Sequence, residues 1–158
     1  MKSDNASIEI RPVNVTDLDE IIGIAEILAE APHWPRKRYD EVLRADSPVR
    51  RIALVAADPQ SREVVGFIIA SLVLPEAELE TIAVAPERQR QGIGARLLEK
   101  LVHELKAAGA EELHLEVRAS NQPAIRFYRS ENFRQTGVRP RYYVDPEEDA
   151  VLMSLRLE

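Results

Sequence analysis

The segment Arg88-Gln89-Arg90-Gln91-Gly92-Ile93-Gly94-Ala95 decides the expected fold, because it joins an apolar strand to the most regular helical pattern of the chain. The strand, expected from Leu79 to Ala85, stops at Pro86. On the other side, Gly109 marks a helix end, and apolar residues recur with the spacing of one helix face at Ile93, Leu97, Leu98, Leu101, Val102 and Leu105. A turn between a strand end and a helix start offers free backbone N–H groups at the positive end of the helix dipole. The segment therefore predicts an anion-binding site.

The residues of this loop suit a pyrophosphate. Gly92 and Gly94 let a ligand approach the backbone without meeting a Cβ, and Arg88, Arg90 and Arg96 add positive charge. The loop lacks the Gly-Lys-Ser/Thr end of a P-loop and the Gly-x-Gly-x-x-Gly fingerprint, so the common nucleotide motifs do not fit. The alternative interpretation is a plain helix entry in which the glycines only ease the turn.

Strands and helices alternate around this segment. Periodicity and turn residues predict strands at 8–13, 52–56, 64–69, 79–85, 113–117, 133–143 and 150–157, and helices at 16–29, 36–45, 93–108 and 122–128. Thr16 and Asp19 resemble a capping pair for the first helix, and Asn121 is expected to cap the last one. The order β-α-α-β-β-β-α-β-α-β-β predicts an α/β fold of the α+β mixed-sheet type, with helices on both faces and parallel crossovers only in the later units.

Composition narrows the class of protein. The 158 residues are expected to form a single domain, 1–158, and the absence of cysteine removes acyl-cysteine chemistry and Cys-based zinc sites. A net charge of -6 disfavours broad binding to nucleic acid or to a membrane. The polar residues 1–5 do not form a signal sequence, so we expect a cytoplasmic protein. His33, His103 and His114 show no metal-ligand spacing, and no metal is expected.

Gln89-Arg90-Gln91-Gly92-Ile93-Gly94 matches the pattern Gln/Arg-x-x-Gly-x-Gly/Ala, and on this motif the chain resembles the GCN5-related N-acetyltransferases (GNAT). The resemblance covers nearly the whole chain and is most specific for the RimI branch, the bacterial ribosomal-protein-alanine N-acetyltransferases. The first third carries less of it than the rest. The segments that carry it, besides the glycine motif, are Ile82-Ala83-Val84, Leu115-Glu116-Val117-Arg118-Ala119-Ser120-Asn121, Phe127-Tyr128, Arg141-Tyr142-Tyr143 and Glu148-Asp149-Ala150. Asn132 stands where the family usually has glycine, and it tolerates the same left-handed helix end.

The resemblance implies acetyl-CoA as co-substrate and assigns roles to individual residues. Glu116, on the polar face of its strand, would take the proton of the acceptor amine, and Tyr128 would protonate the departing thiolate. The backbone N–H of Val84 would stabilise the charge that develops on the thioester oxygen. The expected cofactor-binding residues are Ile82, Ala83, Val84, Arg90, Gln91, Gly92, Ile93, Gly94, Ala95 and Asn121.

Each role has a structural alternative. Glu116 could be a salt-bridged strand residue, with Arg118 as its partner, and Tyr128 could serve packing alone. Asn121 could cap a helix with or without touching the cofactor. Trp34 could line a groove for a peptide, together with Tyr142 and Tyr143, or belong to the core.

The most specific expectation is an acetyl-CoA-dependent N-α-acetyltransferase that acts on a protein N-terminus by direct transfer in a ternary complex. The resemblance favours the N-terminal alanine of a small-subunit ribosomal protein as the acceptor. The alternatives are acetylation of a small amine or a lysine side chain on the same fold, and a regulatory module that binds acetyl-CoA without turnover. The acidic turn 145–149 carries negative charge that suits a basic acceptor chain.

Overall fold

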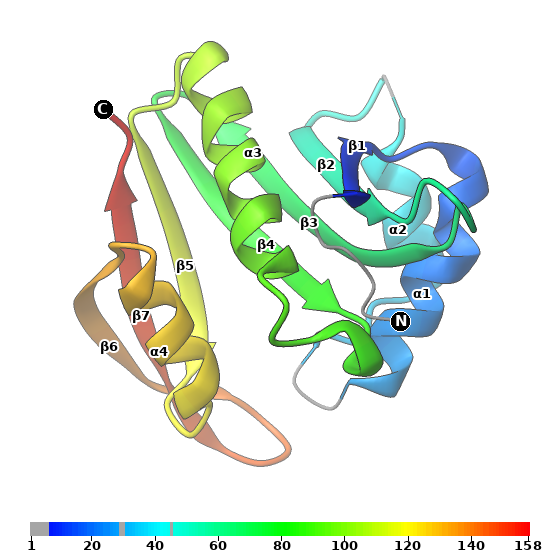
Figure 1. The fold of residues 1–158 in the computed structure, drawn as a ribbon. Coiled ribbons are helices and arrows are strands. Elements are labelled where there is room, and N and C mark those ends of the chain that lie inside the picture. The colour runs from blue at the N-terminus through cyan, green and yellow to red at the C-terminus, as the bar shows by residue number, and fades with distance from the viewer. Residues whose placement is uncertain (1–6, 29–30, 45) are drawn as a thin grey trace.

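The computed structural model describes residues 7–28, 31–44 and 46–158 (Figure 1). Within these ranges, seven strands form one sheet: β1 (Glu9–Pro12), β2 (Arg50–Ala57), β3 (Val64–Val73), β4 (Glu76–Val84), β5 (Glu112–Arg118), β6 (Arg134–Tyr143) and β7 (Glu148–Arg156). The helices are α1 (Leu18–Ile27), α2 (Arg36–Val42), α3 (Ile93–Ala107) and α4 (Gln122–Ser130), with short 3₁₀ turns at Val15–Asp17 and Pro86–Arg88. None of the helices described is long and apolar enough to span a membrane. Residues 1–5 of the polar N-terminus and residues 29 and 45, where the first two helices are expected to end, lie outside the described residues.

The sheet is mixed, as predicted. Its order is β1-β2-β3-β4-β5-β7-β6. Neighbouring strands are antiparallel except β4 and β5, which are parallel and are connected through α3. The single parallel crossover therefore falls in the second half of the chain, where the sequence places it.

Helices cover both faces of the sheet, and alternation along the strands produces two apolar cores. On β3, Ile68 and Ala70 face the larger core with α3 and α4, whereas Phe67 and Ile69 face the smaller core with α1 and α2. Figure 1 shows α3 crossing the sheet over β4, with α1 and α2 beyond the sheet. Both faces of β3 are consequently buried, which explains its nearly continuous apolar sequence.

The start of α1 corrects one prediction. Asn14, not Thr16, is the capping residue: its side chain accepts from the backbone N–H of Thr16 at 3.1 Å, and Asp17 accepts from the backbone N–H of Asn14 at 2.8 Å. The predicted Thr16–Asp19 cap is wrong because the box forms around a 3₁₀ turn that precedes α1. Asp17 is buried in this box and pairs with Arg11 at 2.8 Å.

The parallel ladder between β4 and β5 is short. It runs from Glu76 beside Glu112 to Glu78 beside His114. Beyond these residues the two strands diverge, and the first turn of α3 and helix α4 lie near their carboxyl ends (Figure 1). The register of β3 against β4 also shifts at Glu80, which has no partner residue on β3. This bulge changes which side chains of β4 face α3 just before the strand reaches the glycine loop.

Candidate functional site

Backbone donors face the side on which β4 and β5 diverge. The N–H of Ala85 donates to the carbonyl of Val65 on β3 at 2.8 Å. Hydrogen-bonded and non-hydrogen-bonded pairs alternate along an antiparallel ladder, so the N–H of Ala83 points to β3 and those of Ile82 and Val84 point away from it, toward β5. These two N–H groups can therefore donate to a ligand that lies between the strands.

The glycine loop continues from this strand end. Gly92 is the N-cap of α3 with φ +80°, and a Cβ placed on it would meet no atom within 4 Å. The side chain of Gln89 donates to the carbonyl of Val84 at 3.0 Å, which fixes the loop to the end of β4. The space beside Gly92 is therefore open, and the first N–H groups of α3 have no partner within the helix, which is compatible with the anion-site hypothesis.

The three arginines near the loop differ in what they contact. Arg88 approaches Asp58 at 3.8 Å, and Arg96 donates to the carbonyl of Ile8 at 2.7 Å. Both are therefore engaged with other parts of the protein. Arg90, with φ +61°, makes no ion pair with any described residue. Arg88 nevertheless keeps two buried guanidinium nitrogens without a hydrogen-bond partner in the described part of the chain, so Arg88 and Arg90 both have donors to offer an anion.

Helix α4 packs against the start of α3, which brings Tyr128 to the same end of the sheet. A Cβ on Gly94 would lie 3.6 Å from the ring of Phe127. The ring of Tyr128 lies 5.4 Å from that of Phe127 and 5.5 Å from that of Phe133, and only 8% of the residue is exposed. Burial raises the pKa of Tyr128 above its ordinary value, so the phenol keeps its proton. The phenol therefore has a proton to give, but a raised pKa also makes it a weaker acid. The tight ring packing of the alternative interpretation is present as well.

Asn121 caps α4 as predicted, since its side-chain oxygen accepts from the backbone N–H of Ala124 at 3.2 Å. The cap leaves the side-chain NH₂ group of Asn121 without a role in the helix. A contact between that group and a cofactor remains a prediction.

Glu116 lies on β5 with its side chain on the face opposite α3 and α4. Its carboxylate pairs with Arg139 of β6 at 3.2 Å, and 22% of the side chain is exposed. The hydroxyl of Tyr142 also donates to Glu116, and this bond is the main reason that the pKa of Tyr142 is raised. The hairpin of β6 and β7 therefore holds the carboxylate at the edge of the acceptor face, the surface of β4 and β5 that lies opposite α3.

The predicted Glu116–Arg118 pair is wrong. Arg118 pairs instead with Glu148 at 3.3 Å, and its guanidinium lies over the ring of Tyr143 at 4.4 Å. The side chains of residues two apart on a strand share a face but stand about 7 Å apart, so partners from a neighbouring hairpin can come closer. Burial, followed by the charge of Glu116, raises the pKa of Tyr143 to about 12.

The aromatic residues expected at the acceptor side occupy two places. Tyr142 and Tyr143 lie on β6 beside Glu116, with their rings 5.1 Å apart. Trp34 lies between α1 and α2, its ring 5.3 Å from that of Tyr39 and covered by the guanidinium of Arg38 at 3.8 Å. Tyr142 and Tyr143 thus adjoin the candidate base, whereas Trp34 packs against the smaller core.

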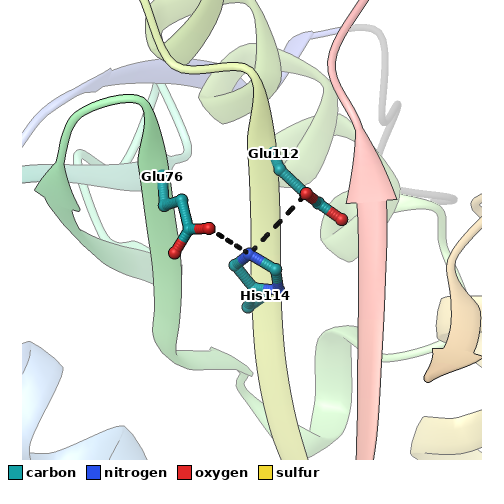
Figure 2. Close-up of side chains that lie close together, drawn as sticks. All are labelled: Glu76, Glu112 and His114. Atoms are coloured by element: carbon teal, nitrogen blue, oxygen red, sulfur yellow. Dashed lines mark ion pairs between the residues drawn. The ribbon is translucent and has the colours of Figure 1, made fainter.

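Sequence spacing missed one cluster of metal-ligating side chains. Figure 2 shows Glu76, Glu112 and His114, whose ligand atoms lie within 4.8 Å of one another. The Nε2 atom of His114 is 3.7 Å from Glu76 and 4.0 Å from Glu112, distances that also describe ion pairs with a protonated imidazole. The residues come from two strands, so no local spacing signals them. One imidazole and two carboxylates could hold Zn²⁺, but all three side chains are partly exposed and lie at the end of the ladder remote from the glycine loop.

Comparison with known proteins places this geometry among acetyltransferases. Residues 18–133 match the model of the Acetyltransferase (GNAT) family. The chain is 47% identical over 98 residues to the [ribosomal protein bS18]-alanine N-acetyltransferase of Escherichia coli K12, a match that covers 61% of this chain and 66%, just under two thirds, of that protein. The crystal structure of the E. coli ribosomal-protein-S18-alanine N-acetyltransferase superposes with a TM-score of 0.80 at 36% identity, over 96% of this chain and 94% of the other. Arabidopsis thaliana NAA60 in complex with acetyl-CoA shares the fold alone, with a TM-score of 0.84 at 21% identity over 95% of this chain and 98% of that one.

Proposed function

The chain belongs to the acetyltransferase (GNAT) family, and from this premise we propose that it is an acetyl-CoA-dependent N-α-acetyltransferase of protein N-termini. The observation that carries the proposal is the arrangement at the diverging ends of β4 and β5. Free N–H groups of Ile82 and Val84 adjoin the glycine loop, while Glu116 and Tyr128 come from the elements on the other side of the divergence.

The residues present fit acetyl-CoA, which supplies an acetyl group as a reactive thioester. Gly92 leaves open space at the start of α3, where N–H groups can hold a pyrophosphate. Ile82 and Val84 present N–H donors along β4, suited to an extended amide chain and to the thioester oxygen. The expected cofactor contacts of Ala83, Gln91, Ile93, Ala95 and Asn121 belong to this proposal.

Glu116 acts as the general base in the proposed mechanism. An α-amine with a pKa near 8 arrives mostly protonated at pH 7, so a carboxylate must take one proton, directly or through a water. The N–H of Val84 stabilises the charge that develops on the thioester oxygen as the amine nitrogen bonds to the acetyl carbon. Tyr128, whose proton is retained, gives that proton to the sulfur as the C–S bond breaks, and the second proton that the nitrogen loses on becoming an amide replaces it through solvent. The chain has no cysteine, and its sequence shows no Ser/His/Asp arrangement that would supply another nucleophile, so the proposal passes the acetyl group directly from thioester to amine.

The proposed acceptor is a protein chain that begins with alanine, in the first instance a small-subunit ribosomal protein. The name of the E. coli relative supports this choice, and so does chemistry. An α-amine is less basic than a lysine side chain by about 2 to 3 pKa units, so far more of it is neutral at pH 7. Such an acceptor is made in the cytoplasm, which is where the proposal places the enzyme, acting on protein and on neither nucleic acid nor membrane.

The test is an acceptor panel with acetyl-CoA. Purified protein is incubated with hexapeptides that begin with alanine, with N-terminally blocked lysine peptides and with polyamines, and released CoA is measured. The proposal expects the free N-terminal peptides to give the highest kcat/KM. Highest activity on polyamines or on lysine peptides would favour the alternative acceptors. Binding of acetyl-CoA without release of CoA for any acceptor would indicate a non-catalytic module.

A further inference from the structure

Glu78 is a carboxylate without a counter-ion on the acceptor face. The carboxylates around it have cationic partners: Glu80 pairs with Arg51 at 3.0 Å, and Glu116 pairs with Arg139 at 3.2 Å. Among residues 7–28, 31–44 and 46–158, Glu78 makes no ion pair and no side-chain hydrogen bond. Of the three carboxylates Glu78, Glu80 and Glu116, Glu78 is thus the one whose charge no described cation neutralises through an ion pair.

Glu78 is exposed, and its surroundings are negative. Partial desolvation of the carboxyl raises the pKa of Glu78, and the charges of Glu116 and Glu80 raise it further. Arg38 and His114 act in the opposite direction, but the guanidinium of Arg38 lies over the ring of Trp34. A cation that approached Glu78 would relieve this repulsion.

An acceptor chain can bring such a cation. Glu78 precedes Ile82 by four residues on β4, which is about 13 Å along the strand, and an extended peptide covers about 3.3 Å per residue. Arg38 of α2 and Tyr142 of β6 both lie close enough to Glu78 to interact with it electrostatically. A chain whose amine lies beside Ile82 therefore passes Glu78 with its next few residues.

We propose that Glu78 determines specificity by binding a cationic side chain, arginine or lysine, at the second to fourth position of the acceptor. This inference rests on the proposed function, because it needs a peptide whose N-terminus occupies the diverging ends of β4 and β5. The carboxylate contacts substrate and selects it, and it takes no part in proton transfer. Glu76, two residues earlier on the same strand and face but paired with His114, has no such role.

The experiment compares acceptor hexapeptides that begin with alanine and carry arginine, norleucine or glutamate at position 2, 3 or 4. For the wild-type protein we expect arginine to lower KM about three- to fivefold relative to norleucine at one of these positions, the range of a partly exposed ion pair. Glu78→Gln should bring the ratio close to one, and Glu78→Lys should invert it in favour of glutamate. Glu76→Gln is the matched control and should keep the wild-type ratio.

The outcomes separate this inference from the proposed function. If the wild-type protein acetylates none of the peptides, the proposed function fails. If it acetylates them without an arginine preference, or if Glu78→Gln keeps that preference, the role of Glu78 is overturned while the function stands. Circular dichroism confirms that each variant is folded, and Glu78→Gln alone decides the matter should Glu78→Lys fail to fold.

Discussion

Replacing Gly92 by glutamate should weaken acetyl-CoA binding strongly and leave the fold in place. Gly92 has φ +80°, so any L side chain there is strained, at a cost of about 1–2 kcal/mol. A new Cβ would meet no atom within 4 Å, so no steric cost is added. For a domain of this size the strain corresponds to a fall in Tm of about 2–8 °C.

The effect on binding should be larger, because the new carboxylate would stand beside the pyrophosphate. Two like charges about 5 Å apart repel by about 3 kcal/mol at an effective dielectric constant near 20, which is about 100-fold in Kd. Gly92→Gln introduces the same strain and nearly the same volume without the charge. The difference between the two variants therefore isolates the electrostatic contribution.

Isothermal titration calorimetry with acetyl-CoA measures the Kd of the wild type and of both variants, and thermal unfolding measures their stability. We expect equal Tm values for the two variants and a Kd for Gly92→Glu about 100-fold above that of Gly92→Gln. Variants that bind within threefold of each other would refute the placement of the pyrophosphate at the first turn of α3.

Three further variants test the base, the acid and a buried ion pair. Glu116→Gln should lower kcat/KM most at neutral pH, and the loss should shrink as the pH approaches the pKa of the free α-amine, because a lost base matters less once the acceptor is neutral. CoA release from pH 6.5 to 9.5 measures this dependence. Tyr128→Phe should lower kcat by about 100-fold at every pH from 6 to 10, since burial raises the pKa of Tyr128 and the wild-type phenol stays protonated across that range; stopped assays of kcat measure it. The hydrogen bond from Arg11 lowers the pKa of Asp17 in the folded protein. The pair therefore stabilises the fold fully at pH values above the ordinary carboxyl pKa of about 3.9, and this stabilisation is lost as the pH falls through the lower pKa of the folded state. Asp17→Asn should therefore lower the free energy of unfolding by about 2 kcal/mol at pH 7 and by much less near pH 2, as urea unfolding measures.

Each of these results has a contrary outcome. A uniform loss of activity for Glu116→Gln across the pH range would mean that Glu116 only holds Arg139 and Tyr142 in place. Full activity of Tyr128→Phe would leave the tyrosine with packing alone. Equal stability of Asp17→Asn and wild type at pH 7 would show that Arg11 contributes nothing through this pair.

Local patterns predicted the elements that depend on local chemistry. The apolar face of α3, the hairpin of β2 and β3 and the Asn121 cap all appear where the sequence places them. Asn132 adopts φ +72°, the left-handed helix end expected for it. These features are set by neighbouring residues, so spacing along the chain contains the necessary information.

The partners of site residues could not be predicted in the same way. Glu116 meets Arg139 although β7 lies between β5 and β6, because β7 pairs with both strands and brings them into one sheet. The side chains of the cluster in Figure 2 meet across the β4–β5 ladder. Such contacts depend on strand order and register. The N–H directions of Ile82 and Val84 likewise follow from the ladder with β3, which only the structure defines.

The most direct test of the account is the position of the acetyl group on its product. A peptide that begins with alanine and carries an internal lysine is incubated with acetyl-CoA and the protein, next to the same peptide with a blocked N-terminus, and tandem mass spectrometry locates the modification. The account predicts acetyl on the α-nitrogen of alanine and no product from the blocked peptide. Acetylation of the internal lysine at a comparable or higher rate would contradict it.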